Sequence, residues 1–211
     1  MTNQDKDINT TQETAAPESG GRRRFLGAGS AAAPFILTMV SQPALGVTCF
    51  TPSRSLSKNT SISQQGKYGE CTGAESPGNY KRHTDPDDTA YHWPTNCPPS
   101  TPFHSLFVQG TTSATAFTKT ENGVTRSMTM AEVLNDGANQ DDGKVAKHLI
   151  GAYLNVLGGN SAVIPPNVIT EQGVRDIWFD YVNQGYYEPT AGVQWRAEQI
   201  KNYLKTNGIV K

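Results

Sequence analysis

The second half of the chain shows apolar residues at helical spacing. From Met128 onward they recur every three or four positions, which places them on one face of an α-helix. The first stretch opens with Thr129 and Glu132, the spacing of a capping box. Later stretches lie between start and glycine signals and predict three helices: one that starts at Asp141-Asp142 and ends at Gly158-Gly159, one from Thr170 to Gly185, and one capped by Thr190 that ends at Asn207-Gly208. Four short amphipathic helices predict a small helical bundle.

Upstream of this bundle the pattern is irregular. Residues 47–70 are polar and show no period, which predicts an extended arm. The next segment is rich in proline, and its apolar runs after Phe103 fit either two short strands about Gly110 or a helix followed by a strand. Asn122-Gly123 marks a turn. The expected fold is mainly α, with one short β-hairpin at most, in a single globular domain that covers 71–211, irregular over 71–127 and helical over 128–207.

The first 46 residues have the layout of an export signal. Three arginines precede an Ala- and Gly-rich apolar run, and small residues follow it up to Gly46. The run is too short to span a bilayer. The order of its signal residues resembles the twin-arginine translocation signal; these are Arg22, Arg23, Phe25 and Leu26. An ordinary secretory signal with three arginines is the alternative, and both predict export to the periplasm, the cell surface or the medium. The resemblance also implies the twin-arginine translocase as a partner during export.

The charge balance and the hydropathy of the chain argue against two classes of protein, those that bind nucleic acid and those that span a membrane. The chain carries 18 Lys and Arg against 19 Asp and Glu, a net charge of −1. This balance argues against a nucleic-acid-binding protein, which would show a basic surface, and it gives no polybasic membrane patch. No second apolar run of spanning length follows the signal, so we expect no permanent membrane span.

Three cysteines follow the predicted signal. Cys71 and Cys97 bracket the irregular proline-rich segment, so we predict a disulfide between them that pins this segment. Cys49 would then be left near the new amino terminus, to pair with a partner chain or to exchange into the bridge. The spacing holds no Cys-x-x-Cys, which excludes a thioredoxin-like redox site.

A family resemblance arises from two stretches. Residues 76–83, followed by Trp93-Pro94, resemble a module of secreted bacterial proteins with a Gly-aromatic-Trp-Lys-Asn-His signature, and later helices at 130–134 and 146–155 match two helices of that module. Three positions depart from the signature: Asn79 replaces an aromatic residue, Tyr80 stands where Trp is usual, and Arg82 replaces Asn. The resemblance covers roughly residues 71–180. It implies an extracellular or surface module for which no reaction is established.

The densest polar group lies in the same region. Two imidazoles and a carboxylate suit zinc with one position open for water, which gives the candidate metal ligands His83, Asp85, Asp87 and His92. The alternative is a solvated turn, because Asp-Pro-Asp-Asp is a common turn sequence.

Calcium is the other ionic option. Asp85, Asp87 and Asp88 supply the hard oxygen ligands that calcium prefers, and residues 139–142 form a second acidic group. Neither group fits an EF-hand loop. We therefore expect no cofactor, with zinc or calcium as the alternatives.

The sequence favours a non-enzymatic binding or structural protein that is exported and contacts another protein or a surface polymer. Its candidate binding residues are Tyr80, Lys81, His83, His92 and Trp93, and the alternative is that Tyr80 and Trp93 only cover one end of the bundle. Two other functions stay open: a metal-dependent hydrolase that uses His83 and His92, and an accessory subunit of an exported oxidoreductase.

Overall fold

The computed structural model describes residues 46–57, 66–107, 116–136 and 144–211, all within one compact unit that spans 42–211. The predicted export signal, the segment around Gly110 and the second acidic group at 139–142 lie outside the described residues.

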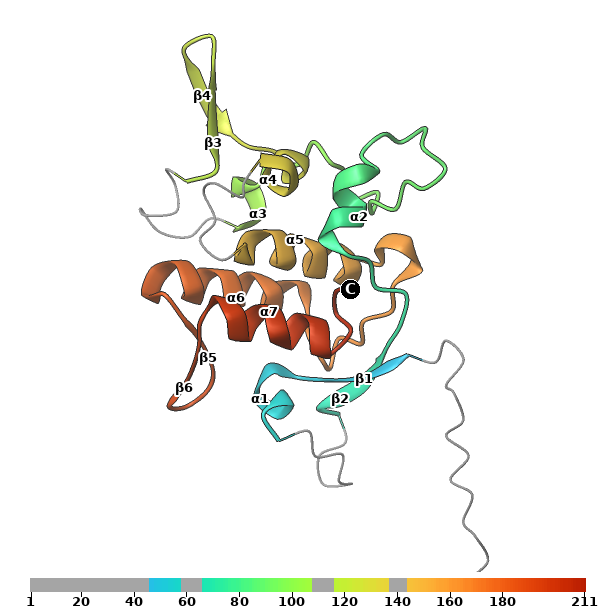
Figure 1. Cartoon of the computed structure of the whole chain (residues 1–211), viewed down its shortest axis with the longest axis vertical. Helices are drawn as coiled ribbons and strands as arrows, with labels where there is room; N and C mark the ends of the chain where they lie inside the picture. Colours follow the sequence, from blue (N-terminus) through green and yellow to red (C-terminus); the bar gives the residue numbers. More distant parts are fainter. Residues whose placement is uncertain (1–45, 58–65, 108–115, 137–143) are drawn as a thin grey trace, which may run out of the picture. The chain divides into compact units, whose positions relative to one another are not determined.

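Helices and strands are both present in the described chain (Figure 1). The helices are α1 (Pro52–Ser55), α2 (Pro77–Arg82), α3 (His104–Phe107), α4 (Met130–Asp136), α5 (Val145–Val156), the 3-10 helix η3 (Gly159–Ser161), α6 (Glu171–Gln184) and α7 (Ala197–Thr206). The strands are β1 (Val47–Phe50), β2 (Tyr68–Cys71), β3 (Thr118–Glu121), β4 (Val124–Ser127), β5 (Tyr187–Thr190) and β6 (Val193–Trp195). They pair as β1–β2, β3–β4 and β5–β6, each pair antiparallel.

The fold is therefore mixed α and β, and the prediction of a mainly α bundle is wrong. Three two-stranded sheets accompany the helices in the described residues. None of the described strands exceeds four residues. A period of two cannot be recognised over so few positions, and β3 and β4 are almost wholly polar, so the sequence pattern missed them.

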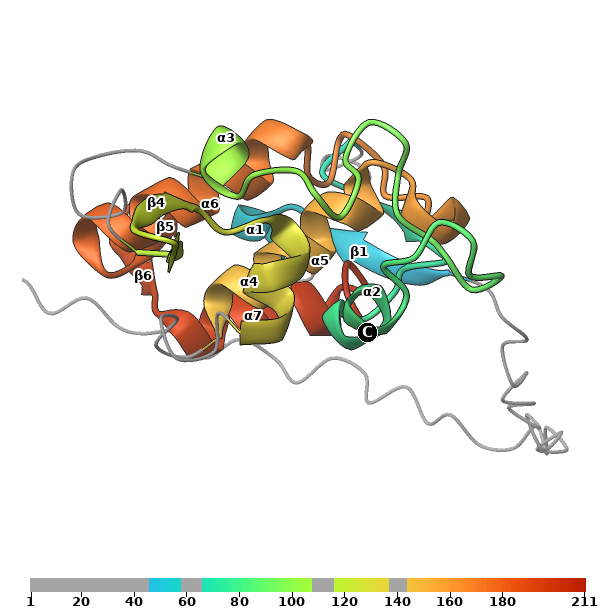
Figure 2. The same cartoon turned by 90° about the horizontal axis from the view of Figure 1, so that it is seen from above.

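Helix α5 occupies the centre of the domain. Nine of its residues are buried, from Val145 to Asn155, and it contacts α2 and α4 on one side and α6 and α7 on the other (Figures 1 and 2). Its predicted end is confirmed, because Gly158 adopts the left-handed conformation with φ of 85°. Burial on several sides explains why its apolar positions are nearly continuous rather than confined to one stripe.

An aromatic cluster joins α3 to α6. Phe103 stacks on Phe107 with ring centroids 5.1 Å apart and meets the edge-on ring of Trp178 at 5.5 Å. Trp178 donates its indole N–H to the carbonyl oxygen of Phe107, which satisfies the buried polar atom of the ring. Trp178 belongs to the core, because only 2 % of its surface is exposed.

The predicted boundaries hold for α4 and α6 but not for α7. Thr129 and Glu132 form the expected capping box, and Thr170 caps α6 by accepting a hydrogen bond from Gly173 N at 3.0 Å. Thr190 lies in strand β5 rather than at a helix cap, and α7 starts later, at Ala197. The β5–β6 hairpin turns at Gly192, whose φ of 79° favours glycine.

The predicted disulfide is also wrong. Cys49 pairs with Cys71, with Cα atoms 5.8 Å apart, and Cys97 is a buried free thiol. The reason is that β1 pairs with β2, which brings Cys49 and Cys71 together across two strands. The described part of the predicted arm is thus two strands and helix α1, with Cys49 and Phe50 buried.

Candidate functional site

The signature segment forms helix α2 and the loop after it. Ser76 caps the helix by accepting a hydrogen bond from Asn79 N at 3.1 Å. Of the predicted binding residues, Tyr80 and Trp93 are 1 % and 4 % exposed, and their rings meet edge to face at 5.8 Å. Trp93 donates its indole N–H to the Tyr80 carbonyl at 3.0 Å. These two aromatic residues are therefore part of the interior, while Lys81 is exposed and His83 and His92 are partly exposed.

Asn155 connects this segment to the central helix. It is fully buried, and its Oδ1 accepts hydrogen bonds from the Tyr80 hydroxyl at 2.7 Å and from Glu75 N at 2.9 Å. Its Nδ2 donates to the carbonyl oxygens of Glu75 at 2.9 Å and Ile209 at 2.8 Å. Burial raises the pKa of Tyr80, so its hydroxyl stays protonated as a donor. The two stretches that carry the family resemblance thus meet in the core.

The predicted metal ligands are not assembled into a site. His83 Nδ1 lies 2.6 Å from the carboxylate of Asp88, and this hydrogen bond is the main cause that lowers the pKa of Asp88. Asp85 accepts a hydrogen bond from Asp87 N at 3.0 Å, a local turn contact. Across the described residues, which include the whole 83–92 loop, no three His, Cys, Asp or Glu side chains are placed to hold an ion. The set of His83, Asp85, Asp87 and His92 therefore stays a prediction that this arrangement of the described residues does not support.

The surroundings of Cys97 disfavour the thiolate form of its side chain. Its side chain is buried, and burial raises its pKa, with a smaller opposing contribution from a hydrogen bond to Thr101. A neutral buried thiol is a poor nucleophile, because the thiolate is the reactive form.

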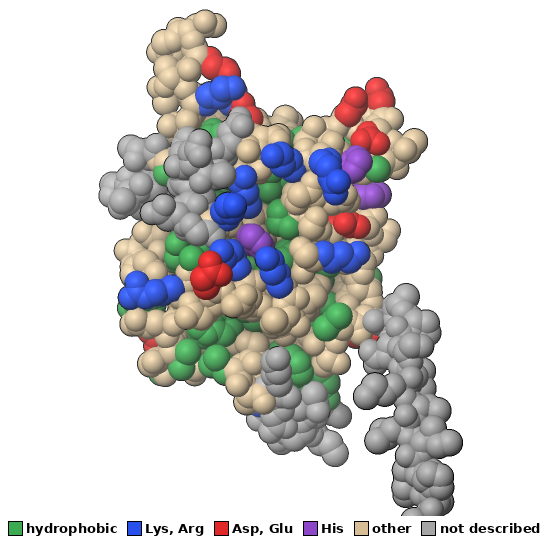
Figure 3. All heavy atoms as spheres, viewed as in Figure 1, with side chains coloured by type: hydrophobic (Ala, Val, Ile, Leu, Met, Phe, Trp, Pro, Cys, Tyr) green, Lys and Arg blue, Asp and Glu red, His purple; other side chains and the backbone are tan. Residues whose placement is uncertain are grey.

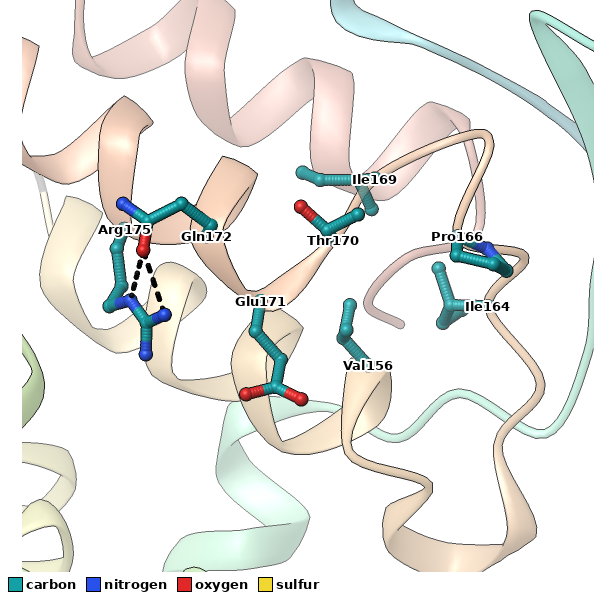
Figure 4. Close-up of a pocket in the computed structure, with 8 residues that line it drawn as sticks. All are labelled: Val156, Ile164, Pro166, Ile169, Thr170, Glu171, Gln172 and Arg175. Carbon is teal, nitrogen blue, oxygen red and sulfur yellow. Dashed lines mark hydrogen bonds between the residues drawn. The ribbon is translucent and has the colours of Figure 1, made fainter.

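A hollow of about 430 Å³ lies beside the start of α6 (Figure 4). Val156, Ile164 and Ile169 form its apolar side. On the other side, the guanidinium of Arg175 donates two hydrogen bonds to Gln172, at 2.8 and 3.2 Å (Figure 4). The same guanidinium donates to the Tyr153 hydroxyl, which in turn donates to the Glu171 carboxylate at 3.4 Å. These polar groups hydrogen-bond to one another, so their positions do not require a bound ligand.

Lysine and arginine side chains gather over α2, α5 and α7 (Figure 3). We define the basic face as the six residues Lys81, Arg82, Lys144, Lys147, Lys201 and Lys205. Within these helices and their caps, Arg196 adds a further cation and Glu198 is the one carboxylate, paired with Lys201 at 2.6 Å. The net charge of −1 does not reveal this surface, because acidic residues that lie mostly on other elements cancel its positive charge in the sum.

His148 lies within the basic face. It donates a hydrogen bond from Nδ1 to the Lys144 carbonyl at 2.9 Å. Burial lowers the pKa of His148, and the nearby charges of Lys205 and Lys201 lower it further. The imidazole therefore stays neutral at physiological pH, and the positive charge of this surface comes from lysine and arginine.

Within the described ranges, every helix is too short or too polar to cross a bilayer. The chain matches no protein-family model, and no curated protein or solved structure is significantly similar to it.

Proposed function

We propose that this chain is an exported, non-enzymatic binding protein that contacts its partner through the basic face. The observation that carries the proposal is the concentration of six cationic side chains over α2, α5 and α7 in a chain of net charge −1. Such a one-sided charge distribution creates a field that attracts an acidic partner and orients it on approach. Lys81, one of the predicted binding residues, belongs to this surface.

The disulfide supports the proposed location outside the cytoplasm. Cys49–Cys71 is compatible with an oxidising location, where structural disulfides form and persist. It follows the predicted twin-arginine-type signal directly, so the periplasm, the cell surface and the medium are the places where we expect the protein to act.

The test of export uses a bacterium that has a twin-arginine translocase. The full chain should be found outside the cytoplasm, starting after Gly46 and oxidised at one cysteine pair. The double substitution Arg22→Lys and Arg23→Lys should retain it in the cytoplasm, whereas the control Arg24→Lys should not. Export of the double variant would contradict the twin-arginine route, and wild-type protein that stays cytoplasmic and reduced would contradict the proposed function.

A further inference from the structure

We infer that the basic face binds a linear polyanion, an extended polymer with a negative charge on each repeat. The inference rests on the proposed function, because it names the partner class of the same surface. It adds two things to that function: how the charges are arranged on the surface, and which kind of partner this arrangement favours.

The cations form rows on packed helices. Lys201 and Lys205 stand one turn apart on α7, about 6 Å from each other. Lys144 and Lys147 flank the first turn of α5, and α5 packs on α7. The charges of Lys201 and Lys205 act on His148, whose ring bonds to the Lys144 carbonyl oxygen. The rows of α5 and α7 therefore lie side by side.

Helix α2 extends the surface beyond these two rows. It packs on α5, and its last turn carries the exposed Lys81 and Arg82. Figure 3 shows Lys and Arg side chains spread over α2, α5 and α7. The surface is thus longer than any single small anion, which would contact only one or two of its cations.

The residue types favour a polymer over one compact ligand. Five of the six are lysines, which act as point charges, whereas planar bidentate recognition of a single carboxylate or phosphate favours arginine. Each exposed ion pair contributes little to affinity, so useful affinity requires many contacts at once. A chain of repeated charges supplies them.

A membrane surface fits less well. Among the described residues, the exposed large apolar side chains are Val47, Leu56, Val124 and Val163, and none of them lies on α2, α5 or α7. A surface that binds lipid usually adds apolar side chains that enter the acyl boundary to its basic residues. The polymer is therefore the partner we argue for, with phosphate or carboxylate as the repeated group.

The experiment measures binding of the exported protein to sodium polyphosphate, to polyglutamate and to vesicles that contain phosphatidylglycerol, over a range of salt. The test variant neutralises four exposed cations of the face: Lys81→Gln, Arg82→Gln, Lys144→Gln and Lys205→Gln. The control lowers the net charge by the same amount at exposed positions on other elements: Lys67→Glu, Asn183→Glu and Gln194→Glu. Thermal unfolding checks that both variants fold.

We expect the wild type and the control to bind at least one polymer, with the test variant weaker by about tenfold or more and its log–log salt slope shallower by about one for each contacting cation removed. The preferred polymer identifies phosphate or carboxylate as the repeated group. Three results would overturn the inference: wild-type protein that binds neither polymer, whether or not it binds vesicles; equal binding by the test variant; or equal loss in the control. Export without polymer binding would refute this inference alone, whereas failure of export would refute the proposed function.

Discussion

Asn155 shows how a single polar side chain can define a core. Its amide makes four hydrogen bonds to two segments that are far from it in sequence, three of them to Glu75 and Tyr80 and one to Ile209. Because no water reaches it, each partner depends on this one side chain. Asn155 therefore fixes where α2 and the segment after α7 meet α5.

Replacing Asn155 should cost far more than removing one of its bonds. Asn155→Leu leaves the Tyr80 hydroxyl and the Ile209 carbonyl oxygen buried without a partner and removes both bonds to the partly buried Glu75 backbone. We expect a loss of about 3 kcal/mol in the free energy of unfolding. Tyr80→Phe removes one donor while Glu75 N still serves Asn155 Oδ1, and we expect a loss of about 1 kcal/mol. Urea unfolding measures both values. Equal losses would contradict the central role of Asn155.

This residue also shows what the sequence could not reveal about the site. The motif makes Tyr80 and Trp93 candidates for binding, with a packing role as the alternative, and both are buried in the structure. The hydroxyl of the buried Tyr80 is satisfied by an acceptor 75 positions away in sequence. Local periodicity carries no information about such a partner, so a short motif alone cannot separate a core tyrosine from a ligand contact.

Where α2 packs on α5, the close approach of the two elements requires glycine. A Cβ on Gly151 would lie 2.9 Å from the Pro77 ring, and one on Gly159 would meet the Tyr80 hydroxyl and lie 2.9 Å from the His92 carbonyl oxygen. The absence of a side chain at these positions lets α2 and the 83–92 loop pack on the end of α5.

Gly159→Ala should therefore destabilise the fold. The added methyl group must displace Tyr80 from its bond to Asn155, and we expect a loss of about 2 kcal/mol. Gly78→Ala is the matched control, because its Cβ would lie no closer than 3.7 Å to a neighbour and alanine favours the helix. Thermal unfolding of the two variants should show a lower midpoint only for Gly159→Ala. A similar decrease in both would mean that crowding at Tyr80 is not the cause.

The β3–β4 hairpin is anchored to α4 by charge. Arg126 donates to both carboxylate oxygens of Glu132 at 2.7 Å, and Lys119 lies 3.5 Å from the same carboxylate. The hydrogen bonds from Arg126 are the main cause that lowers the pKa of Glu132 to about 2. Glu132 also closes the capping box of α4, so one side chain serves the hairpin and the helix.

This depressed pKa predicts a pH dependence of stability. Since the folded pKa lies below the ordinary value of 4.5, ionised Glu132 stabilises the fold above about pH 4.5, and this contribution is lost as pH falls toward about 2. In Glu132→Gln the decrease in unfolding free energy between pH 7 and pH 3 should be smaller than in the wild type, by about 1 kcal/mol or less because solvent screens the pair. Glu70→Gln serves as an exposed carboxylate control. An unchanged acid dependence in Glu132→Gln would contradict the assignment.

Among the elements, capped helices were predictable and short strands were not. Thr129, Thr170 and Gly185 mark their helix ends by local chemistry, which a sequence displays directly. The sequence pattern assigns β6 and the last residue of β5 to the start of the final helix, because Val193 and Ala197 also fit a helical period. Hairpin strands of three or four residues are too short to show a clear period of two, so the helical interpretation is favoured.

At the scale of the whole molecule, the first strand is joined to the last helix. Asn207 Oδ1 accepts from Phe50 N at 3.0 Å, and the Tyr203 hydroxyl donates to the Phe50 carbonyl at 3.0 Å. The Cys49–Cys71 bridge holds β1 on β2 beside these contacts. The bridge therefore stabilises more than its own hairpin.

Removing the bridge should lower stability without removing the fold of the helices. For the variant Cys49→Ala, Cys71→Ala we expect a loss of about 3 kcal/mol, the loop-entropy value for a separation of 22 residues. The measurement is urea unfolding under oxidising conditions. Reduction of the wild type should give a similar value, and the variant itself should not respond to reductant. A variant as stable as the oxidised protein would contradict a structural role for the bridge.

The distribution of charge is the other property that appears only at this scale. A net charge of −1 argued against a basic surface, but the helices that pack together are the ones that carry the cations. Net charge is a sum over the chain, whereas a partner responds to the local field of one surface. Only the packing of α2, α5 and α7 reveals that surface.

The contacts of Phe50 have a consequence for how the protein is made. Strand β1 leaves the ribosome about 150 residues before its partners on α7, at the elongation rate of roughly 5–20 residues per second. During those seconds Phe50 and Cys49 lack the residues that bury them. The domain therefore cannot close progressively from its amino-terminal strand, and its completion waits until Tyr203 and Asn207 have been synthesised.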